Sequence, residues 1–140
     1  MKTALTALTA YAACTAARSR PERPGPRKTE LLGGRVRLHA LWNEGAAFGL
    51  PLPPEALPLA SAGALALVWT RRARSPLGAG LVLGGGLSNL TERLQTGKVY
   101  DYIQFPKAPL GLKRYVFNLA DLAILTGAAC LAVSKEKRRR

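Results

Sequence analysis

The sequence predicts an all-α membrane protein with four transmembrane helices and a small β element outside the membrane. Three observations favour this fold class. Of the 140 residues, 48% are hydrophobic, and the 21 Lys and Arg outnumber the 8 Asp and Glu. Long stretches such as 56–70 and 75–91 carry no charge. The basic residues gather at the ends of these stretches, as in membrane proteins, whereas a soluble helix interleaves charged and apolar residues.

Four apolar segments, 3–17, 56–70, 76–90 and 116–133, mark the expected helices of a single domain that covers 1–140. The first three are short, because a helix needs about 20 residues to cross the hydrocarbon core. An alternative is that the segments are buried helices of a soluble bundle. Against this alternative, 84–86 is Gly-Gly-Gly, which makes a poor soluble helix. Gly80 and Gly84 lie four residues apart and suit close contact between helices in lipid.

Segment 3–17 is expected to be a short first transmembrane helix. A second interpretation is a lipoprotein signal peptide that ends in a lipidated cysteine, because residues 11–14 are Tyr-Ala-Ala-Cys after a short apolar run. Position −3 would then be Tyr11 rather than a small aliphatic residue, so the helix is preferred.

Flanking charge predicts the orientation of the segments. Arg71, Arg72 and Arg74 lie between the second and third segments, and the basic tail 135–140 follows the fourth. Basic connectors stay in the cytoplasm, so both termini are expected there, with 18–55 and 91–115 outside. Arg18 and the basic residues that follow it would then face outward, against the same rule. Either the rule is overridden here or the first segment is not an ordinary span.

The small β element is expected at about 34–50, in the first outer connector. Residues 35–40 alternate polar and apolar side chains, the period of a half-exposed strand. Asn43, Glu44 and Gly45 predict a turn, and the Pro-rich stretch 20–27 predicts a loop. His39 is expected to be a polar strand residue. As the only histidine beside two cysteines, it leaves too few ligands for a zinc site.

The chain has only two aspartates, and both are candidates for chemistry. Asp121 lies inside the fourth apolar segment, where an ionisable group is expensive and its default interpretation is functional. Asp101 lies in the second outer connector between apolar and aromatic residues. Two carboxylates brought together can share one proton, which leaves one acid and one base to activate water. The alternative for Asp121 is a helix-packing residue bonded to Asn118 or Arg93.

Four short motifs surround these residues: NEGAAF at 43–48, GGGLSNLTER at 84–93, VYDY at 99–102 and FNLAD at 117–121. They resemble, in the same order, the NxGAAF, GGxxGNxxDR, VxDF and FNxAD segments of lipoprotein signal peptidase (signal peptidase II), an integral-membrane aspartyl protease. The length and the expected four-span layout agree with that family.

The resemblance implies a role for each matching residue. Asp101 and Asp121 would be the catalytic pair that polarises water. The residues expected to bind substrate or support the pair are Asn43, Asn89, Glu92, Arg93 and Asn118, with Glu92 supporting Arg93. Asn118 and Asp121, three apart, share a helix face, as do Asn89 and Arg93, four apart.

The implied reaction removes the signal peptide from lipid-modified prolipoproteins, on the amino side of the lipidated cysteine. The resemblance implies no metal and no organic cofactor. It implies contact with membrane lipid but not with nucleic acid, a monomer, and a multi-pass location in the bacterial inner membrane.

Three departures from the family pattern motivate an alternative function. Ser88 stands where the pattern has Gly, Glu92 stands where it has Asp, and no aspartate precedes Glu22, although the family's first segment carries one. The alternative is a catalytically inactive relative that binds lipoproteins or signal peptides. A third hypothesis, based only on the net charge of +13, is a basic peripheral protein that binds nucleic acid or anionic membrane and is extracted by salt.

Overall fold

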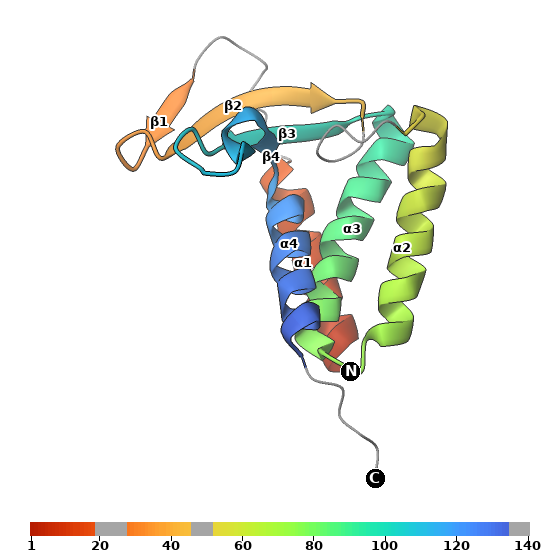
Figure 1. Ribbon diagram of the computed structural model, residues 1–140. Helices are drawn as coiled ribbons and strands as arrows, with labels where there is room; N and C mark the ends of the chain where they lie inside the picture. The colour runs from red at the N-terminus through yellow and green to blue at the C-terminus, as the bar shows by residue number, and fades with distance from the viewer. Residues whose placement is uncertain (19–27, 46–51, 135–140) are drawn as a thin grey trace.

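In the part of the chain that the structure describes, four helices stand side by side beneath a four-stranded antiparallel sheet (Figure 1). The computed structural model describes residues 1–18, 28–45 and 52–134, and the expected loop 20–27 and basic tail 135–140 lie outside these ranges. The helices are α1 (Lys2–Arg18), α2 (Leu57–Arg71), α3 (Pro76–Thr96) and α4 (Leu119–Val133). Short 3₁₀ turns, η2 (Pro54–Ala56) and η3 (Leu112–Arg114), precede α2 and the last strand.

The prediction of an all-α fold with four transmembrane helices is wrong. Within the described ranges, no helix is both long and apolar enough to cross a membrane. Helices α2 and α4 have 15 residues each, which at 1.5 Å per residue span only about 22 Å, against roughly 30 Å for a hydrocarbon core. Helix α3 has 21 residues, but it contains five glycines and the charged pair Glu92 and Arg93.

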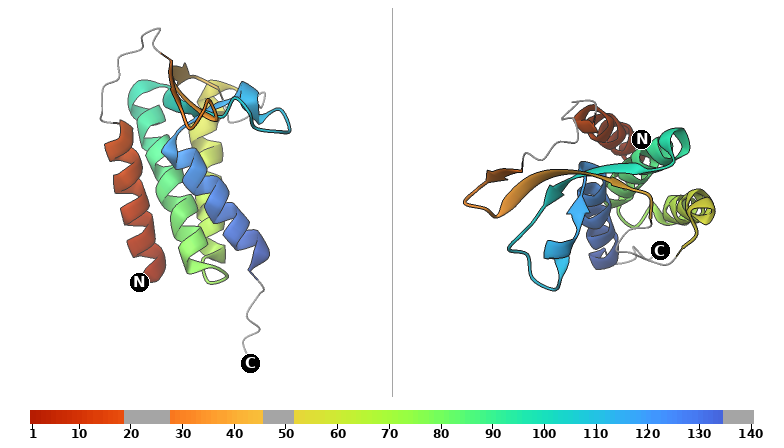
Figure 2. Two further views of the ribbon diagram at one scale, coloured as in Figure 1. Left: turned by 90° about the vertical axis from the view of Figure 1, so that its left-hand side faces the viewer. Right: turned by 90° about the horizontal axis from the view of Figure 1, so that it is seen from above.

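The sheet is larger than the sequence predicts. Its strands are β1 (Thr29–Leu31), β2 (Val36–Asn43), β3 (Val99–Gln104) and β4 (Val116–Phe117), in that spatial order. Only β2 falls in the expected element at 34–50, of which 46–50 lies outside the described residues. Strand β3 comes from the second outer connector, and β4 from the start of the apolar segment 116–133. Seen from above, the sheet crosses the tops of the helices (Figure 2).

Helix α3 is the central helix and packs against α1, α2 and α4. Its small residues allow this close contact. A Cβ atom on Gly84 would collide with the carbonyl oxygen of Ala7 in α1, and one on Gly85 would lie 2.7 Å from the carbonyl oxygen of Ala120 in α4. These positions admit only glycine, so the glycines that weaken α3 as an isolated helix are the ones that let three helices meet.

The ends of α3 and α4 place the polar residues beneath the sheet. Ser75 caps α3, and its hydroxyl accepts a hydrogen bond from the Gly78 N–H at 3.2 Å. At the other end, Gly97 adopts the left-handed conformation (φ 76°) that stops the helix and turns the chain into β3. Helix α3 thus runs six residues past the predicted end at 90 and carries 89–93 to the sheet.

Two glycine substitutions test the packing of α3. Gly84→Ala should lower the free energy of unfolding by about 1–3 kcal/mol, because the new methyl group overpacks the contact with α1. The matched control is Gly63→Ala in α2, where an added Cβ meets nothing within 4 Å. It should raise stability by up to about 1 kcal/mol, the gain in helix propensity. Thermal or denaturant unfolding in detergent measures both, and equal effects would contradict the packing described.

Candidate active site

Asn118 is the centre of the site. It is completely buried (0% exposed) at the junction of β4 and α4, where it caps the helix. Its side-chain oxygen accepts a hydrogen bond from the Asp121 N–H at 3.0 Å, and its own N–H donates to Asp121 Oδ2 at 2.9 Å. This reciprocal capping box starts α4 and holds the Asp121 carboxyl at the same time.

Asp101 reaches the same point from the sheet. It lies on β3 opposite Leu41 of β2, and Asn43 lies two residues further along β2. Diagonal neighbours on one face of a sheet are within side-chain reach. Asn43 Nδ2 donates to Asp101 Oδ2 at 3.0 Å, and Asn118 Nδ2 donates to Asp101 Oδ1 at 2.8 Å. Asn118 therefore joins the two aspartates.

Helix α3 supplies the third amide. Asn89 Nδ2 donates to Asp121 Oδ1 at 2.9 Å, and Asn89 Oδ1 accepts from Asn118 Nδ2 at 3.2 Å. Each of the four carboxylate oxygens of Asp101 and Asp121 thus accepts one hydrogen bond, and no two of those bonds come from the same N–H or amide group. Four elements, β2, β3, α3 and α4, fix the pair.

The two aspartates lie in a low-dielectric setting. Asp101 is only 3% exposed. Burial raises the pKa of the Asp101 carboxyl to about 6, and the nearby charge of Asp121 acts in the same direction. Hydrogen bonds from Asn43 and Asn118 favour the ionised form but do not offset the burial. Asp101 can therefore exchange a proton near neutral pH, as an acid or base in catalysis must.

A cavity of about 720 Å³ opens beside the pair. Asp101, Asp121, Asn43, Asn89 and Arg93 contribute its polar wall. The rest is mainly apolar and comes from the strands above and from one face of α2, α3 and α4, with Leu57, Ala64, Val68, Val82, Ile124 and Leu125 among its residues. A long apolar group entering this space would pass close to both carboxyls.

The sequence predicts that Glu92 supports Arg93, but in the structure the two side chains contact different elements. Arg93 Nη2 donates to the Gly45 carbonyl oxygen at 2.8 Å, which ties α3 to the end of β2. Glu92 instead lies 2.9 Å from Nε of Arg18, at the end of α1. Asp121 is held by Asn118 and Asn89, and no hydrogen bond among the described residues joins it to Arg93.

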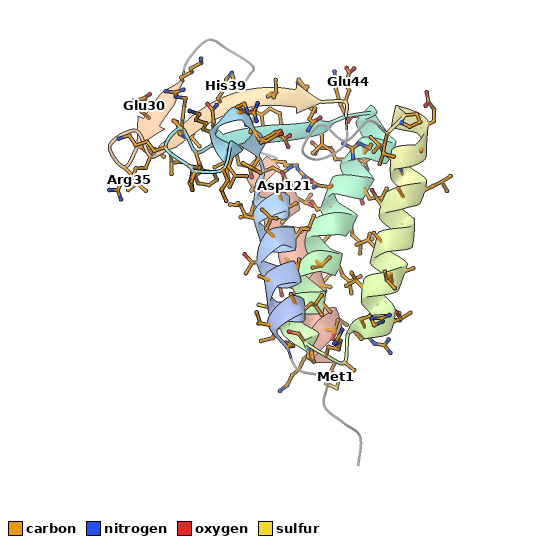
Figure 3. The ribbon with its side chains drawn as sticks, viewed as in Figure 1. Met1, Glu30, Arg35, His39, Glu44 and Asp121 are labelled. Carbon is orange, nitrogen blue, oxygen red and sulfur yellow. The ribbon has the colours of Figure 1, made fainter. Side chains whose placement is uncertain are left out.

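Sequence reasoning missed Arg18 as a site residue, treating it only as a charge on the wrong side. It also missed Tyr102, whose hydroxyl accepts from the Leu119 N–H at 3.3 Å at the start of α4. One signal could have found Arg18. The apolar segments 3–17 and 76–90 are expected to start at the same end of the bundle, so Arg18 and residues 89–93 should both lie at its other end. His39, by contrast, projects from the upper side of the sheet, whereas Asp121 lies beneath it (Figure 3).

Two solved structures, both described as bacterial membrane enzymes, share this fold. Each superposes with a TM-score of 0.76, and the match covers 93% of the solved chain in both cases. It covers 97% of this chain for the first structure and 99% for the second. Their sequence identities are 18% and 17%. At this identity the likeness establishes the fold alone.

The family described as signal peptidase (SPase) II matches residues 7–135. The chain therefore belongs to the signal peptidase II family. Among relatives named lipoprotein signal peptidase, that of Pelotomaculum thermopropionicum is 44% identical over 101 residues, covering 66% of this chain and 62% of the relative. That of Chlorobaculum tepidum is 36% identical over 130 residues, covering 82% of this chain and 80% of the relative.

The match to two of these relatives is partial. The chain spans 62% of the length of the Pelotomaculum thermopropionicum protein and 62% of that of Nitrobacter hamburgensis, to which it is 36% identical. For Chlorobaculum parvum the identity is 43%, and the match covers 68% of each chain.

The raised pKa of Asp101 predicts how stability depends on pH. The folded protein binds the Asp101 proton more tightly than the unfolded chain does. The contribution of this proton to the stability of the fold is therefore fully present below about pH 4 and is lost as the pH rises through about 6. The free energy of unfolding of the wild type, relative to Asp101→Asn, should fall by roughly 2 kcal/mol from about pH 4 to about pH 7. Chemical unfolding across this range measures it.

The matched control for this experiment is Glu30→Gln, which removes an exposed carboxyl on β1. It should not reproduce the pH-dependent difference. A wild-type advantage over Asp101→Asn that stays constant or grows with pH would contradict the raised pKa.

Proposed function

We propose that the protein is an aspartyl endopeptidase that removes the signal peptide from lipid-modified prolipoproteins, cutting on the amino side of the lipidated cysteine. The observation that carries this proposal is the pair of aspartates, each oxygen held by a neutral donor, in the wall of an apolar cavity. Membership of the signal peptidase II family supports the same reaction.

In the proposed reaction, Asp101 and Asp121 share one proton. The ionised carboxyl takes a proton from a water molecule, whose oxygen attacks the peptide carbonyl carbon, while the protonated carboxyl donates a hydrogen bond to the carbonyl oxygen. The peptide C–N bond then breaks, and the proton passes to the leaving nitrogen. The pKa of about 6 at Asp101 suits a group that changes protonation state near neutral pH.

The proposed substrate fits the chemistry of the cavity. A signal peptide and an acylated cysteine are both apolar, and ligands of this kind bind in concave apolar sites with a few fixed polar groups. Arg93 lines the cavity, and its Nε is buried without a hydrogen-bond partner among the described residues. We assign this N–H to a carbonyl oxygen of the substrate backbone.

We further propose that the protein acts as a monomer at the bacterial inner membrane, in contact with lipid. One chain supplies both aspartates and all three asparagines. The outer faces of the helices carry exposed leucines, such as Leu5 (68%), Leu59 (78%) and Leu67 (58%), which suit an apolar surrounding. At the basic end, the Arg72 guanidinium lies 4.2 Å from the Trp69 ring centroid, a pairing typical of a membrane interface.

Isosteric variants test the acid pair. Asp101→Asn and Asp121→Asn should each lose nearly all turnover, by about 10³-fold or more, because an amide cannot exchange the proton. The double variant should be scarcely slower than either single variant, because the two carboxyls act as a unit. Cleavage of a lipidated preprotein in detergent measures the rates.

The exposed-acid variant Glu30→Gln is the control and should cleave normally. Robust cleavage by Asp101→Asn would end the aspartyl-peptidase proposal. A wild type that binds lipidated preprotein without cleaving it would favour the inactive-relative hypothesis instead.

The orientation proposed for the protein places the basic end of the bundle toward the cytoplasm, because Arg71, Arg72 and Arg74 lie there. The turn between α2 and α3 and the end of α4 lie at this same end (Figure 1). Single cysteines from Ser75→Cys and Ser134→Cys, in a background without Cys14 and Cys130, should label with an impermeant reagent only after the cells are permeabilised. Labelling of either site in intact cells would contradict the orientation.

A further inference from the structure

Arg18 ends α1 at the level of the acid pair, and its side chain is only 9% exposed where it lies against α3. Nη1 donates to the Ser88 hydroxyl at 2.7 Å and to the Ser88 carbonyl oxygen at 3.0 Å. Nη2 donates to Asn89 Oδ1. Nε lies 2.9 Å from Glu92 Oε2, whose side chain is 15% exposed. The three hydrogen bonds from Nη1 and Nη2 hold the guanidinium in one geometry, and Nε adds an ion pair but no hydrogen bond among the described residues.

The contact with Asn89 fixes which way that amide faces. Asn89 Oδ1 accepts from both Arg18 and Asn118, so the oxygen end of the amide lies between two donors. A reversed amide would set its NH₂ group against both of them. The Nδ2 end is therefore directed at Asp121 Oδ1, to which it donates at 2.9 Å. Arg18 acts on Asp121 through this one intervening side chain.

Glu92 carries the same network to the other aspartate. Its Oε2 atom accepts a hydrogen bond from the Tyr100 N–H at 3.2 Å, and Tyr100 is the residue before Asp101 on β3. The oxygen that pairs with Arg18 thus also holds the backbone that carries Asp101. The ion pair between α1 and α3 is therefore bonded to the Asn89 side chain, which holds Asp121, and to the Tyr100 N–H, next to Asp101.

We propose that Arg18, with Glu92, is a positioning pair for the two aspartates, which orients Asn89 on Asp121 and anchors β3 at Asp101. The inference rests on the proposed function of the acid pair and adds residues to it. Ser88 and Glu92, two of the positions where the chain departs from the GGxxGNxxDR pattern, are both partners of Arg18. A serine hydroxyl and the longer glutamate are what this guanidinium contacts.

Graded variants at Arg18 test the role. Arg18→Gln should lower kcat by about 100-fold with KM changed less than about threefold, because the acids are displaced but the cavity is intact. Arg18→Lys should lose only about 10-fold, since a lysine keeps the charge beside Glu92 but not the full set of contacts. The acidic limb of the kcat/KM profile should move to higher pH in Arg18→Gln, because the Arg18 cation lowers the pKa of Asp101.

A second readout does not need turnover. The infrared band of the protonated Asp101 carboxyl, identified by its absence in Asp101→Asn, should titrate at higher pH in Arg18→Gln than in the wild type. This shift is expected even if the wild type fails to cleave, so failure of the inference and failure of the proposed function are distinguishable. A merely structural role for Arg18 would lower stability without moving this titration.

The matched control is the ion pair between Arg37 and Glu30, which is also an Arg–Glu pair (2.8 Å) but is exposed on β1 and β2. Arg37→Gln should leave kcat and the titration unchanged. Should Arg18→Gln fold poorly, the double variant Arg18→Gln/Glu92→Gln removes both buried charges and should fold while turnover stays low. Wild-type kcat in the folded double variant, or wild-type kcat together with an unmoved titration in a folded Arg18→Gln, would overturn the proposal.

Discussion

The complete burial of Asn118 is the constraint on which the rest of the site depends. A buried amide must satisfy its hydrogen-bonding groups, and here it does so by bonding Asp121 at the start of α4, Asp101 on β3 and Asn89 on α3. Those bonds require the three elements to meet at one point. The helix register of α4 and the geometry of the two acids are therefore set by the same contacts and cannot change independently.

Neutral amides rather than cations make the direct contacts to the carboxyls. A guanidinium bonded directly to either acid would hold its pKa low and leave it permanently ionised. Asn43, Asn89 and Asn118 orient the oxygens without supplying a full charge, so at Asp101 burial prevails and the pKa rises to about 6. Arg18 lies one side chain further away from Asp121, which it reaches through Asn89.

The sequence predicts the acids and their asparagines better than it predicts the fold around them. The two aspartates stand out because they are rare and lie in apolar surroundings, and four ordered motifs identify their companions. The prediction of transmembrane helices is wrong because a charge-free stretch of 15 residues fits a short helix as well as a membrane-spanning one. The apolar segment 116–133 includes strand β4, although Asn118 three residues before Asp121 is a capping signal that marks the start of the helix after residue 118. Arg18 was missed because its partners lie about 70 residues away on another helix.

Helix α2 lines the cavity but takes no part in this hydrogen-bond network. It packs chiefly against α3, and six of its residues at helical spacing, Leu57, Ala60, Ser61, Ala64, Leu65 and Val68, face the cavity. None of them bonds an acid or an asparagine of the site. One wall of the cavity, the α2 face, is thus encoded in a stretch of the gene that carries none of the residues bonded to the acids. Substitutions among residues 57–68 can therefore reshape this wall without touching the groups that hold the proton.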